Sequence, residues 1–259
     1  MLSMLFLLSA AASAQDMVYS ETTDDYPFTV SLGLEFNGRV VGTCTGSLIT
    51  PEIILTAAHC GSDYPMDVVT QFGRAFFGSS IYAATTVGFA DGWFHPDYVP
   101  LDNGSSTSST LGRNDIGILV LDEPVDFVDP IWIATDPIDD IARGATVTSI
   151  GFGVDERGNS GVKRASDLIV DRLDSTFLYS DSSTNEGGSN VCSGDSGGPQ
   201  VYWDGEQYIQ WAVHSWADQD CMYQSGSTRV DTTSEWILDQ VEIVHGSRDR
   251  CEVWGRYGD

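Results

Sequence analysis

Basic residues are scarce in this sequence. Its 259 residues include 12 lysines and arginines against 38 aspartates and glutamates, so the formal net charge is −26 at pH 7. A surface this acidic repels phosphate backbones, which excludes nucleic acids as partners. It also disfavours binding to anionic membrane surfaces. We favour an adaptation for solubility over an acidic ligand site as the explanation of this charge. Charge alone does not indicate which chemistry a protein performs.

Long apolar stretches are also missing, apart from one short run at the N-terminus. Residues 1–14, MLSMLFLLSAAASA, are too few to span a bilayer and end in Ala12-Ser13-Ala14, a small-residue pattern typical of signal-peptide cleavage. No basic residue precedes the run, and the alternative interpretation is a buried N-terminal strand. We favour a cleaved signal peptide, which predicts a secreted or periplasmic protein without a membrane anchor.

Cysteines are few, and none has the spacing of a zinc site, so no metal or other cofactor is expected. Disulfides persist in an exported protein, and an odd number of cysteines leaves one unpaired or bonded to a second chain. The leftover is predicted to be Cys251, which lies in a polar C-terminal segment. A monomer is therefore expected unless Cys251 cross-links two chains. The five cysteines are Cys44, Cys60, Cys192, Cys221 and Cys251.

Short strand-like runs make up most of the chain. They are rich in β-branched and aromatic residues and are separated by clusters of Gly, Pro, Asn and Asp. The clearest runs are 27–36, 52–58, 117–122, 145–152, 200–203 and 208–216. A single helix is predicted late in the chain, capped within 231–234 and apolar at Trp236, Ile237, Val241 and Val244. This pattern predicts an all-β barrel or sandwich, with surface loops at the Ser-rich and Gly-rich segments 102–112 and 181–189.

Three segments point to chemistry. LTAAHC contains His59, RNDIGILVL contains Asp115, and CSGDSGGP contains Ser196. Each alone has an ordinary explanation, as a polar residue after a strand, a turn residue or a tight turn. Together they provide a nucleophile, a base and a carboxylate that orients the base. A serine hydroxyl is a poor nucleophile near neutral pH, so an imidazole held by a carboxylate must take its proton.

The segment Gly194-Asp195-Ser196-Gly197-Gly198 also satisfies the G-x-S-x-G pattern of α/β-hydrolases. That fold requires an acid and then a histidine after the serine, with helices alternating between strands. Only His214 and His245 follow Ser196, and the alternating helices are missing. An esterase of that fold is therefore not expected.

The three segments, in the order His, Asp, Ser, resemble the signature segments of the chymotrypsin/trypsin family of serine proteases. TVSL, CTGSLIT, FHPDY, SIGFG, VHSW and EWI resemble further family landmarks in the same order, over residues 27–244. The resemblance implies two six-stranded antiparallel Greek-key β-barrels with the active site between them and a C-terminal α-helix. We divide the chain into a signal peptide (1–14), an N-terminal barrel with His59 and Asp115 (15–125), a C-terminal barrel with Ser196 (126–231), a helix (232–244) and a polar tail (245–259).

The same resemblance implies a secreted serine endopeptidase that cleaves protein or peptide substrates through an acyl-enzyme. His59 is then the general base, Asp115 orients His59, and Ser196 is the nucleophile. The backbone N–H groups of Gly194 and Ser196 form the oxyanion hole. The implied disulfides are Cys44–Cys60 and Cys192–Cys221. The alternative is a catalytically silent binding module on the same fold.

The sequence departs from the family at its N-terminus. Family members commonly carry Arg or Lys followed by Ile-Val-Gly-Gly, and the amine freed there pairs with the Asp beside the catalytic serine, here Asp195. That segment is missing from this sequence. One hypothesis is that signal removal before Gln15 alone yields the active form. The alternatives are another partner for Asp195, or an oxyanion loop that becomes ordered only with substrate.

The specificity pocket also departs from the family. Asn190 stands at the pocket base where trypsin-like members have Asp, so strict cleavage after Arg or Lys is not expected. The resemblance places Ser215, Trp216 and Ala217 along the substrate-binding edge, with Ala217 in place of the usual Gly.

Glutamate-cleaving members of the family place a His just before this Ser and support it with a pocket serine. By that resemblance His214, with Ser193, implies a preference for Glu before the cut, provided that the imidazole is protonated. The alternative is a neutral His214 hydrogen-bonded within the pocket wall. Asp218 and Asp220 lie close by and favour a basic or polar substrate instead.

Overall fold

The computed structural model describes residues 20–100, 112–182 and 189–254. The predicted signal peptide, and most of the two predicted surface loops, lie outside the described residues. No helix in the described part of the chain is long and apolar enough to cross a membrane.

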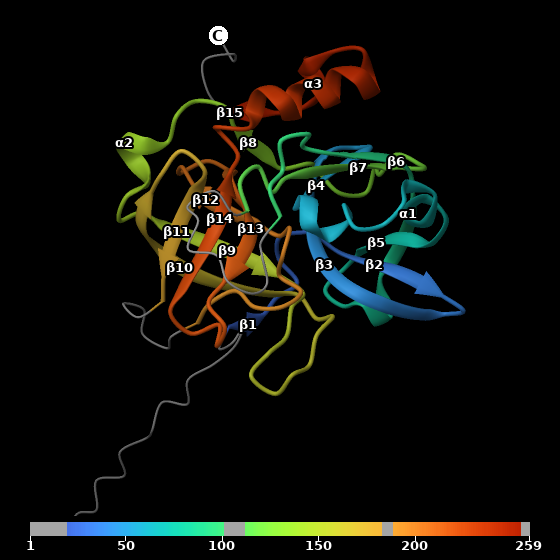
Figure 1. Cartoon of the computed structure of the whole chain (residues 1–259), viewed down its shortest axis with the longest axis horizontal. Coiled ribbons are helices and arrows are strands. Elements are labelled where there is room, and N and C mark those ends of the chain that lie inside the picture. Colours follow the sequence, from blue (N-terminus) through green and yellow to red (C-terminus); the bar gives the residue numbers. More distant parts are fainter. Residues whose placement is uncertain (1–19, 101–111, 183–188, 255–259) are drawn as a thin grey trace, which may run out of the picture.

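Six antiparallel strands from the first half of the chain close into a barrel, called here the first barrel (Figure 1). Its strand order is β2-β3-β4-β7-β6-β5. The strands are β2 (Thr29–Phe36), β3 (Arg39–Thr50), β4 (Ile53–Thr56), β5 (Gly73–Phe77), β6 (Thr85–Phe94) and β7 (Gly117–Leu121). The short helices α1 (Met66–Phe72), η1 (Ala58–Cys60) and η2 (Ile81–Ala83) lie in its connections.

Six further antiparallel strands form the second barrel, in the order β12-β9-β10-β11-β14-β13, closed by pairing of β12 with β13. They are β9 (Thr146–Gly151), β10 (Arg164–Leu173), β11 (Phe177–Asp181), β12 (Pro199–Trp203), β13 (Tyr208–Ala217) and β14 (Gln224–Arg229). The two-residue strand β1 (Glu21–Thr22) pairs with β10, and β8 (Trp132–Ala134) runs parallel to β13. The predicted architecture of two closed six-stranded barrels is confirmed.

The two barrels share part of their apolar core. One cluster of buried side chains includes Val30 and Leu48 of the first barrel, Ile150 and Val213 of the second, and Ile237 of the C-terminal helix, while a separate cluster lies within the second barrel. Burying such side chains between packed layers stabilises one arrangement of the two barrels, since each aliphatic side chain contributes about 1.5–3 kcal/mol when it leaves water. A site at the junction is therefore held rigidly from both sides.

The C-terminal helix α3 spans Ser234–His245, two residues later at its start than predicted. Asp231, expected to help to cap it, is instead bound by the buried Arg229, whose Nη2 lies 2.5 Å from Asp231 Oδ2. The helix ends at Gly246, which adopts a φ of 72°. Figure 1 shows α3 lying above the junction of the two barrels.

The segment predicted as a polar tail is anchored to the second barrel. It contains the short helix η3 (Arg248–Arg250) and the strand β15 (Val253–Trp254), which pairs with β8 in parallel. Between them Cys251 is only 4% exposed and packs in the shared core. The sequence did not indicate this strand, because the segment is polar and a strand of two residues is too short to show periodicity. One further short helix, α2 (Asp139–Ala142), precedes β9.

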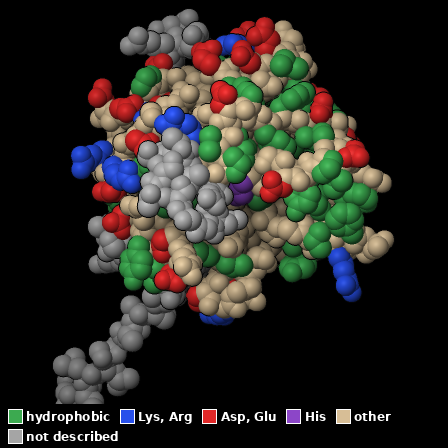
Figure 2. All heavy atoms as spheres, viewed as in Figure 1, with side chains coloured by type: hydrophobic (Ala, Val, Ile, Leu, Met, Phe, Trp, Pro, Cys, Tyr) green, Lys and Arg blue, Asp and Glu red, His purple; other side chains and the backbone are tan. Residues whose placement is uncertain are grey.

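Acidic side chains are scattered over the face of the molecule shown in Figure 2, with only a few basic side chains between them. On this face the acidic side chains are spread over several places, which agrees with the interpretation of the charge as an adaptation for solubility.

Candidate active site

His59 and Asp115 are brought together at the junction of the two barrels. His59 lies in η1, directly after β4, and Asp115 lies two residues before β7, which pairs with β4. Asp115 Oδ1 accepts a hydrogen bond from the backbone N–H of His59 at 2.9 Å, and its Oδ2 lies 2.7 Å from His59 Nδ1. The two contacts fix both the backbone and the ring of His59, so its other ring nitrogen, Nε2, faces away from Asp115.

The carboxylate of Asp115 is completely buried, whereas the side chain of His59 is 28% exposed. Burial by itself lowers the pKa of His59, but the hydrogen bond and the negative charge of Asp115 outweigh it and raise the pKa above its usual value. The imidazolium that forms when His59 takes a proton is therefore stabilised.

Ser215 supplies a third contact to Asp115, and sequence reasoning missed it. Its hydroxyl donates to Asp115 Oδ2 at 2.6 Å, from β13 of the second barrel. The sequence placed Ser215 only at the substrate-binding edge, because 100 positions separate the two residues and no local pattern connects them.

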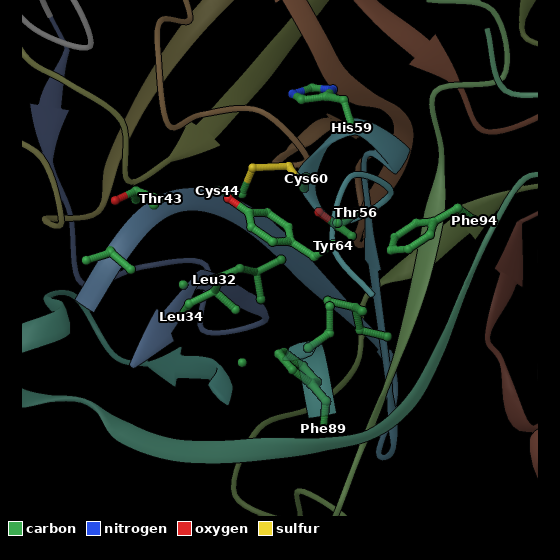
Figure 3. A pocket seen from close by; sticks show the side chains of 17 residues that line it. Leu32, Leu34, Thr43, Cys44, Thr56, His59, Cys60, Tyr64, Phe89 and Phe94 are labelled. Carbon is green, nitrogen blue, oxygen red and sulfur yellow. A yellow bond between two sulfur atoms is a disulfide. The ribbon is translucent and has the colours of Figure 1, made fainter. Parts of the chain in front are cut away.

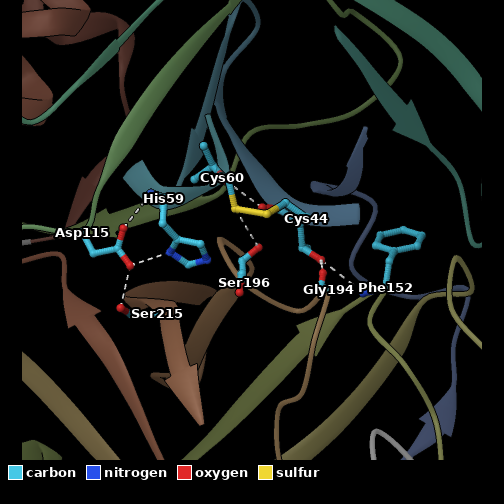
Figure 4. Close-up of a disulfide and its surroundings, with 10 residues drawn as sticks. Cys44, His59, Cys60, Asp115, Phe152, Gly194, Ser196 and Ser215 are labelled. Atoms are coloured by element: carbon cyan, nitrogen blue, oxygen red, sulfur yellow. Dashed lines mark hydrogen bonds and ion pairs between the residues drawn. A yellow bond between two sulfur atoms is a disulfide. The ribbon is translucent and has the colours of Figure 1, made fainter. Parts of the chain in front are cut away.

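Ser196 lies in the connection before β12, at the side of the imidazole that faces away from Asp115 (Figure 4). Its carbonyl oxygen accepts a hydrogen bond from the backbone N–H of Thr45 at 2.8 Å and lies 3.5 Å from Cys60 Sγ, next to His59. Between the described residues there is no hydrogen bond from Ser196 Oγ to His59. This contact is often long in serine hydrolases without substrate and shortens on binding.

Residues 192–196, called here the oxyanion loop, turn sharply so that their N–H groups converge. Gly194 adopts a φ of +98°, and a Cβ there would lie 2.9 Å from Gly153 Cα, so only glycine fits without strain. Its carbonyl accepts a hydrogen bond from Thr45 Oγ1 at 2.9 Å. Within the described ranges, the backbone N–H groups of Gly194 and Ser196 have no acceptor, whereas that of Asp195 bonds to Cys192 at 3.0 Å. Two neighbouring donors are thus available to a developing oxyanion.

The side chain of Asp195, which belongs to this loop, is buried. Its Oδ2 accepts a hydrogen bond from the N–H of Cys192 at 2.9 Å, and its Oδ1 accepts one from the N–H of Gly153 at 2.8 Å. Burial raises the pKa of Asp195 to about 6, although both hydrogen bonds and the charge of Arg164 act in the opposite direction. The partners of Asp195 in the described structure are therefore two peptide groups, with Arg164 as a nearby charge.

The structure contains two disulfides, Cys44–Cys60 and Cys192–Cys221. The first joins β3 to the short helix that carries His59, and the second joins the start of the oxyanion loop to the segment after β13. Cys251 is free, and burial raises the pKa of its thiol to about 12. A thiol with such a pKa stays protonated and unreactive.

A pocket of about 230 Å³ opens beside Ser196. Five of the residues predicted to bind substrate line it: Ser193, His214, Ser215, Trp216 and Ala217. Asn190 does not line it and is fully buried beside Val191, whose N–H bonds to Asn190 Oδ1 at 3.0 Å.

His214 forms part of the buried wall of this pocket. Its Nδ1 lies 3.1 Å from Ser227 Oγ, and burial lowers its pKa to about 3. The imidazole is therefore neutral near neutral pH, which corresponds to the second of the two interpretations made from the sequence.

A second pocket, of about 210 Å³, lies on the other side of His59 and was not anticipated from the sequence (Figure 3). It reaches from the Cys44–Cys60 disulfide into the first barrel. Most of its wall is apolar and includes Leu32, Leu34, Val41, Tyr64, Phe89 and Phe94. These residues come from separate strands and loops, which explains why no single sequence motif indicated it.

Comparisons with known proteins agree with this geometry. The family model described as Trypsin matches residues 18–237. Brachyurin from Leptuca pugilator is 32% identical over 213 residues, which cover 78% of this chain and 88% of brachyurin. A trypsin from Saccharopolyspora erythraea is 31% identical over 194 residues, which cover 68% of this chain and 77% of that trypsin. A solved structure of HL collagenase aligns with a TM-score of 0.67 at 21% identity, over 86% of this chain and 96% of that chain, which supports the fold.

Proposed function

The chain belongs to the trypsin family of serine proteases, and from this membership we propose that it cleaves peptide bonds with Ser196, His59 and Asp115 as its catalytic residues. The observation that carries the assignment is the 2.7 Å contact between His59 Nδ1 and the buried Asp115 carboxylate, with Ser196 on the opposite side of the ring. This arrangement fixes the tautomer in which Nε2 is free to take a proton from Ser196.

In the first half of the reaction, Ser196 Oγ forms a bond to the substrate carbonyl carbon while its proton moves to His59 Nε2. The carbonyl oxygen becomes negative and accepts hydrogen bonds from the N–H groups of Gly194 and Ser196. His59 then gives the proton to the leaving amine as the C–N bond breaks, which leaves an acyl-enzyme. In the second half, water attacks the acyl group with His59 as the base, and Ser196 is released as a hydroxyl.

The specificity that we propose is not a strict preference for Arg or Lys before the cut. Asn190 is neutral and lies outside the pocket lining, so it gives a cationic side chain no charge partner, and the acidic residue in that lining is Asp218. A Glu side chain at that position would meet a neutral His214, because burial lowers the pKa of His214 to about 3, and it would share the pocket with the carboxylate of Asp218. Cleavage after Glu would then depend on hydrogen bonds and would gain nothing from a charged imidazole.

The apolar pocket beside His59 is proposed to receive an apolar side chain on the leaving-group side of the cut. His59 lines this pocket, whereas Ser196 lines the pocket that holds His214 and Trp216. A peptide whose carbonyl sits in the oxyanion loop therefore has one pocket on each side of the scissile bond. Secretion and a monomeric state complete the proposal, and the two disulfides support the former.

The test combines active-site labelling with peptide cleavage. Wild-type protein should react with a fluorophosphonate at Ser196 and digest a peptide library. Ser196→Ala should lose the label and about 10⁴–10⁶-fold in kcat. Ser62→Ala, a change at an exposed serine in the loop after η1, is the matched control and should behave like wild type. A wild-type protein that neither labels nor cleaves would favour a silent binding module.

A further inference from the structure

The Asp195 carboxylate occupies the place that a side chain at position 151 would fill. A Cβ built on Gly151 would overlap Asp195 Oδ1, and one built on Gly153 would lie 2.7 Å from the same atom. Both glycines are therefore needed for the carboxylate to reach the strand end. The carboxylate thus lies where a side chain at position 151 of β9 would face strand β10.

The residue of β10 that faces position 151 is Arg164. In the antiparallel pairing of β9 with β10, Arg164 is directly opposite Gly151. Residues opposite each other in such a pair point to the same face of the sheet, with Cβ atoms about 4.5–5.5 Å apart. The side chain of Arg164 therefore leaves the sheet on the face where the Asp195 carboxylate lies, at the distance of an ordinary cross-strand neighbour.

Two further charged side chains, Asp155 and Lys163, are buried near this pair. Arg164 is buried, and its Nη2 bonds to Asp155 Oδ2 at 3.1 Å, while its Nε has no partner among the described residues. Lys163, also buried, lies 5.8 Å from the centre of the Phe152 ring and donates to the carbonyls of residues 25 and 26. Buried charges are weakly screened, and the positive charge of Arg164 favours the ionised form of Asp195.

We propose that Arg164 is a positioning residue, which keeps the Asp195 carboxylate ionised and so holds the oxyanion loop in its active form. The proposal rests on the function proposed above. An ionised carboxylate accepts hydrogen bonds at both oxygens, and Asp195 uses one oxygen for Cys192 and the other for Gly153. Protonation converts one oxygen into a hydroxyl, which is a weaker acceptor, so one of these bonds weakens and the loop is held less firmly.

Two groups must then be deprotonated for activity. Asp195, whose pKa burial raises to about 6, must be ionised to hold the loop, and His59, whose pKa is also raised, must be neutral to act as the base. Loss of the Arg164 charge removes a favourable partner of the ionised carboxylate, so the pKa of Asp195 rises further. The acid limb of the pH profile therefore moves to higher pH and becomes steeper.

Three variants test this. Arg164→Met removes the charge and keeps much of the side-chain length, Arg164→Lys restores a charge, and Lys163→Met removes the neighbouring buried charge as the matched control. The readout is kcat/KM from pH 5 to pH 9, together with fluorophosphonate labelling and thermal unfolding of each variant. For Arg164→Met we expect the acid limb to move up by about one pH unit, which means about a tenfold larger loss at pH 6 than at pH 9.

Arg164→Lys restores the charge, so its acid limb should lie close to that of the wild type. Lys163→Met should leave the acid limb unchanged, whatever its effect on stability. An Arg164→Met protein that loses the same factor at every pH, or shifts no more than Lys163→Met, overturns the proposal. If Arg164→Met does not fold, the shift is read from Arg164→Lys, which should show a smaller displacement in the same direction. Failure of the proposed function would be seen separately, as an inactive wild-type protein.

Discussion

Ser215 donates a hydrogen bond to Asp115 at 2.6 Å, from the second barrel to a carboxylate that the first barrel holds beside His59. The catalytic carboxylate is thus bound from both halves of the molecule. Ser215→Ala should remove this donor and leave the buried oxygen with one partner fewer, at a cost of about 1–3 kcal/mol in unfolding free energy. Urea unfolding measures the loss, with Ser62→Ala for comparison. Equal stability of the two variants would contradict this interpretation.

Asp115→Asn should cost far more activity than Ser215→Ala. The amide has the size of the carboxylate but presents an NH₂ group and no charge, so His59 is held in the wrong tautomer and its imidazolium is not stabilised. We expect kcat to fall about 10⁴-fold with folding retained. Steady-state kinetics measure the loss, and circular dichroism monitors the fold. A loss below tenfold would show that Asp115 does not orient His59.

The activity of the wild-type protein should rise with pH. His59 acts as the base only when neutral, and its raised pKa means that it becomes neutral above the usual value of 6.5. The midpoint of kcat/KM should therefore lie above pH 6.5. The same shift predicts a stability contribution that is fully present below pH 6.5 and is lost as the pH rises through the folded-state value. A peptide substrate without ionisable groups should be used, and a midpoint below 6.5 would refute the assignment.

The Cys44–Cys60 disulfide should stabilise the protein by restricting its unfolded state. The two cysteines are separated by 16 positions, for which chain-entropy reasoning gives about 3 kcal/mol. The double variant Cys44→Ala/Cys60→Ala should lose this amount in denaturant unfolding and should lose activity earlier on heating, since the bond holds the helix that carries His59. No change in either measurement would mean that the bond is dispensable.

Cys251 should be silent in the folded protein. Its thiol is buried and its pKa is raised to about 12, so a thiol reagent at pH 8 should detect no free thiol until denaturant is added, and then one per chain. Non-reducing electrophoresis should show a single-chain band. A disulfide-linked dimer would require Cys251 to leave the core and would contradict the fold described here.

The catalytic segments and the strands could be predicted from local information, whereas the strand pattern left a barrel or a sandwich open and the two-barrel arrangement came from the family resemblance. His59, Asp115 and Ser196 each lie in a short motif, and the strands follow from runs of β-branched and aromatic residues. The helix starts two residues later than predicted, and its N-cap, Thr233, lies within the predicted capping stretch 231–234, whereas Asp231 pairs with Arg229. That ion pair depends on the folded arrangement, so propensity could not reveal it.

Other features depend on contacts between distant segments, and the sequence did not indicate them. The apolar pocket beside His59 is built from residues between Leu32 and Leu119, and the setting of Asp195 joins β9, β10 and the oxyanion loop. His214 lines the pocket beside Ser196, and burial lowers its pKa to about 3, but that burial cannot be derived from the neighbouring residues in the sequence.

The parallel pairing of β15 with β8 has a practical consequence for anyone who produces this protein. A chain cut back to the end of α3 would uncover the edge of β8, and unpaired strand edges recruit other molecules. Truncated variants that end at α3 should therefore aggregate during purification, although every catalytic residue is retained. Affinity tags are best fused after residue 254, so that β15 is retained and still covers the edge of β8.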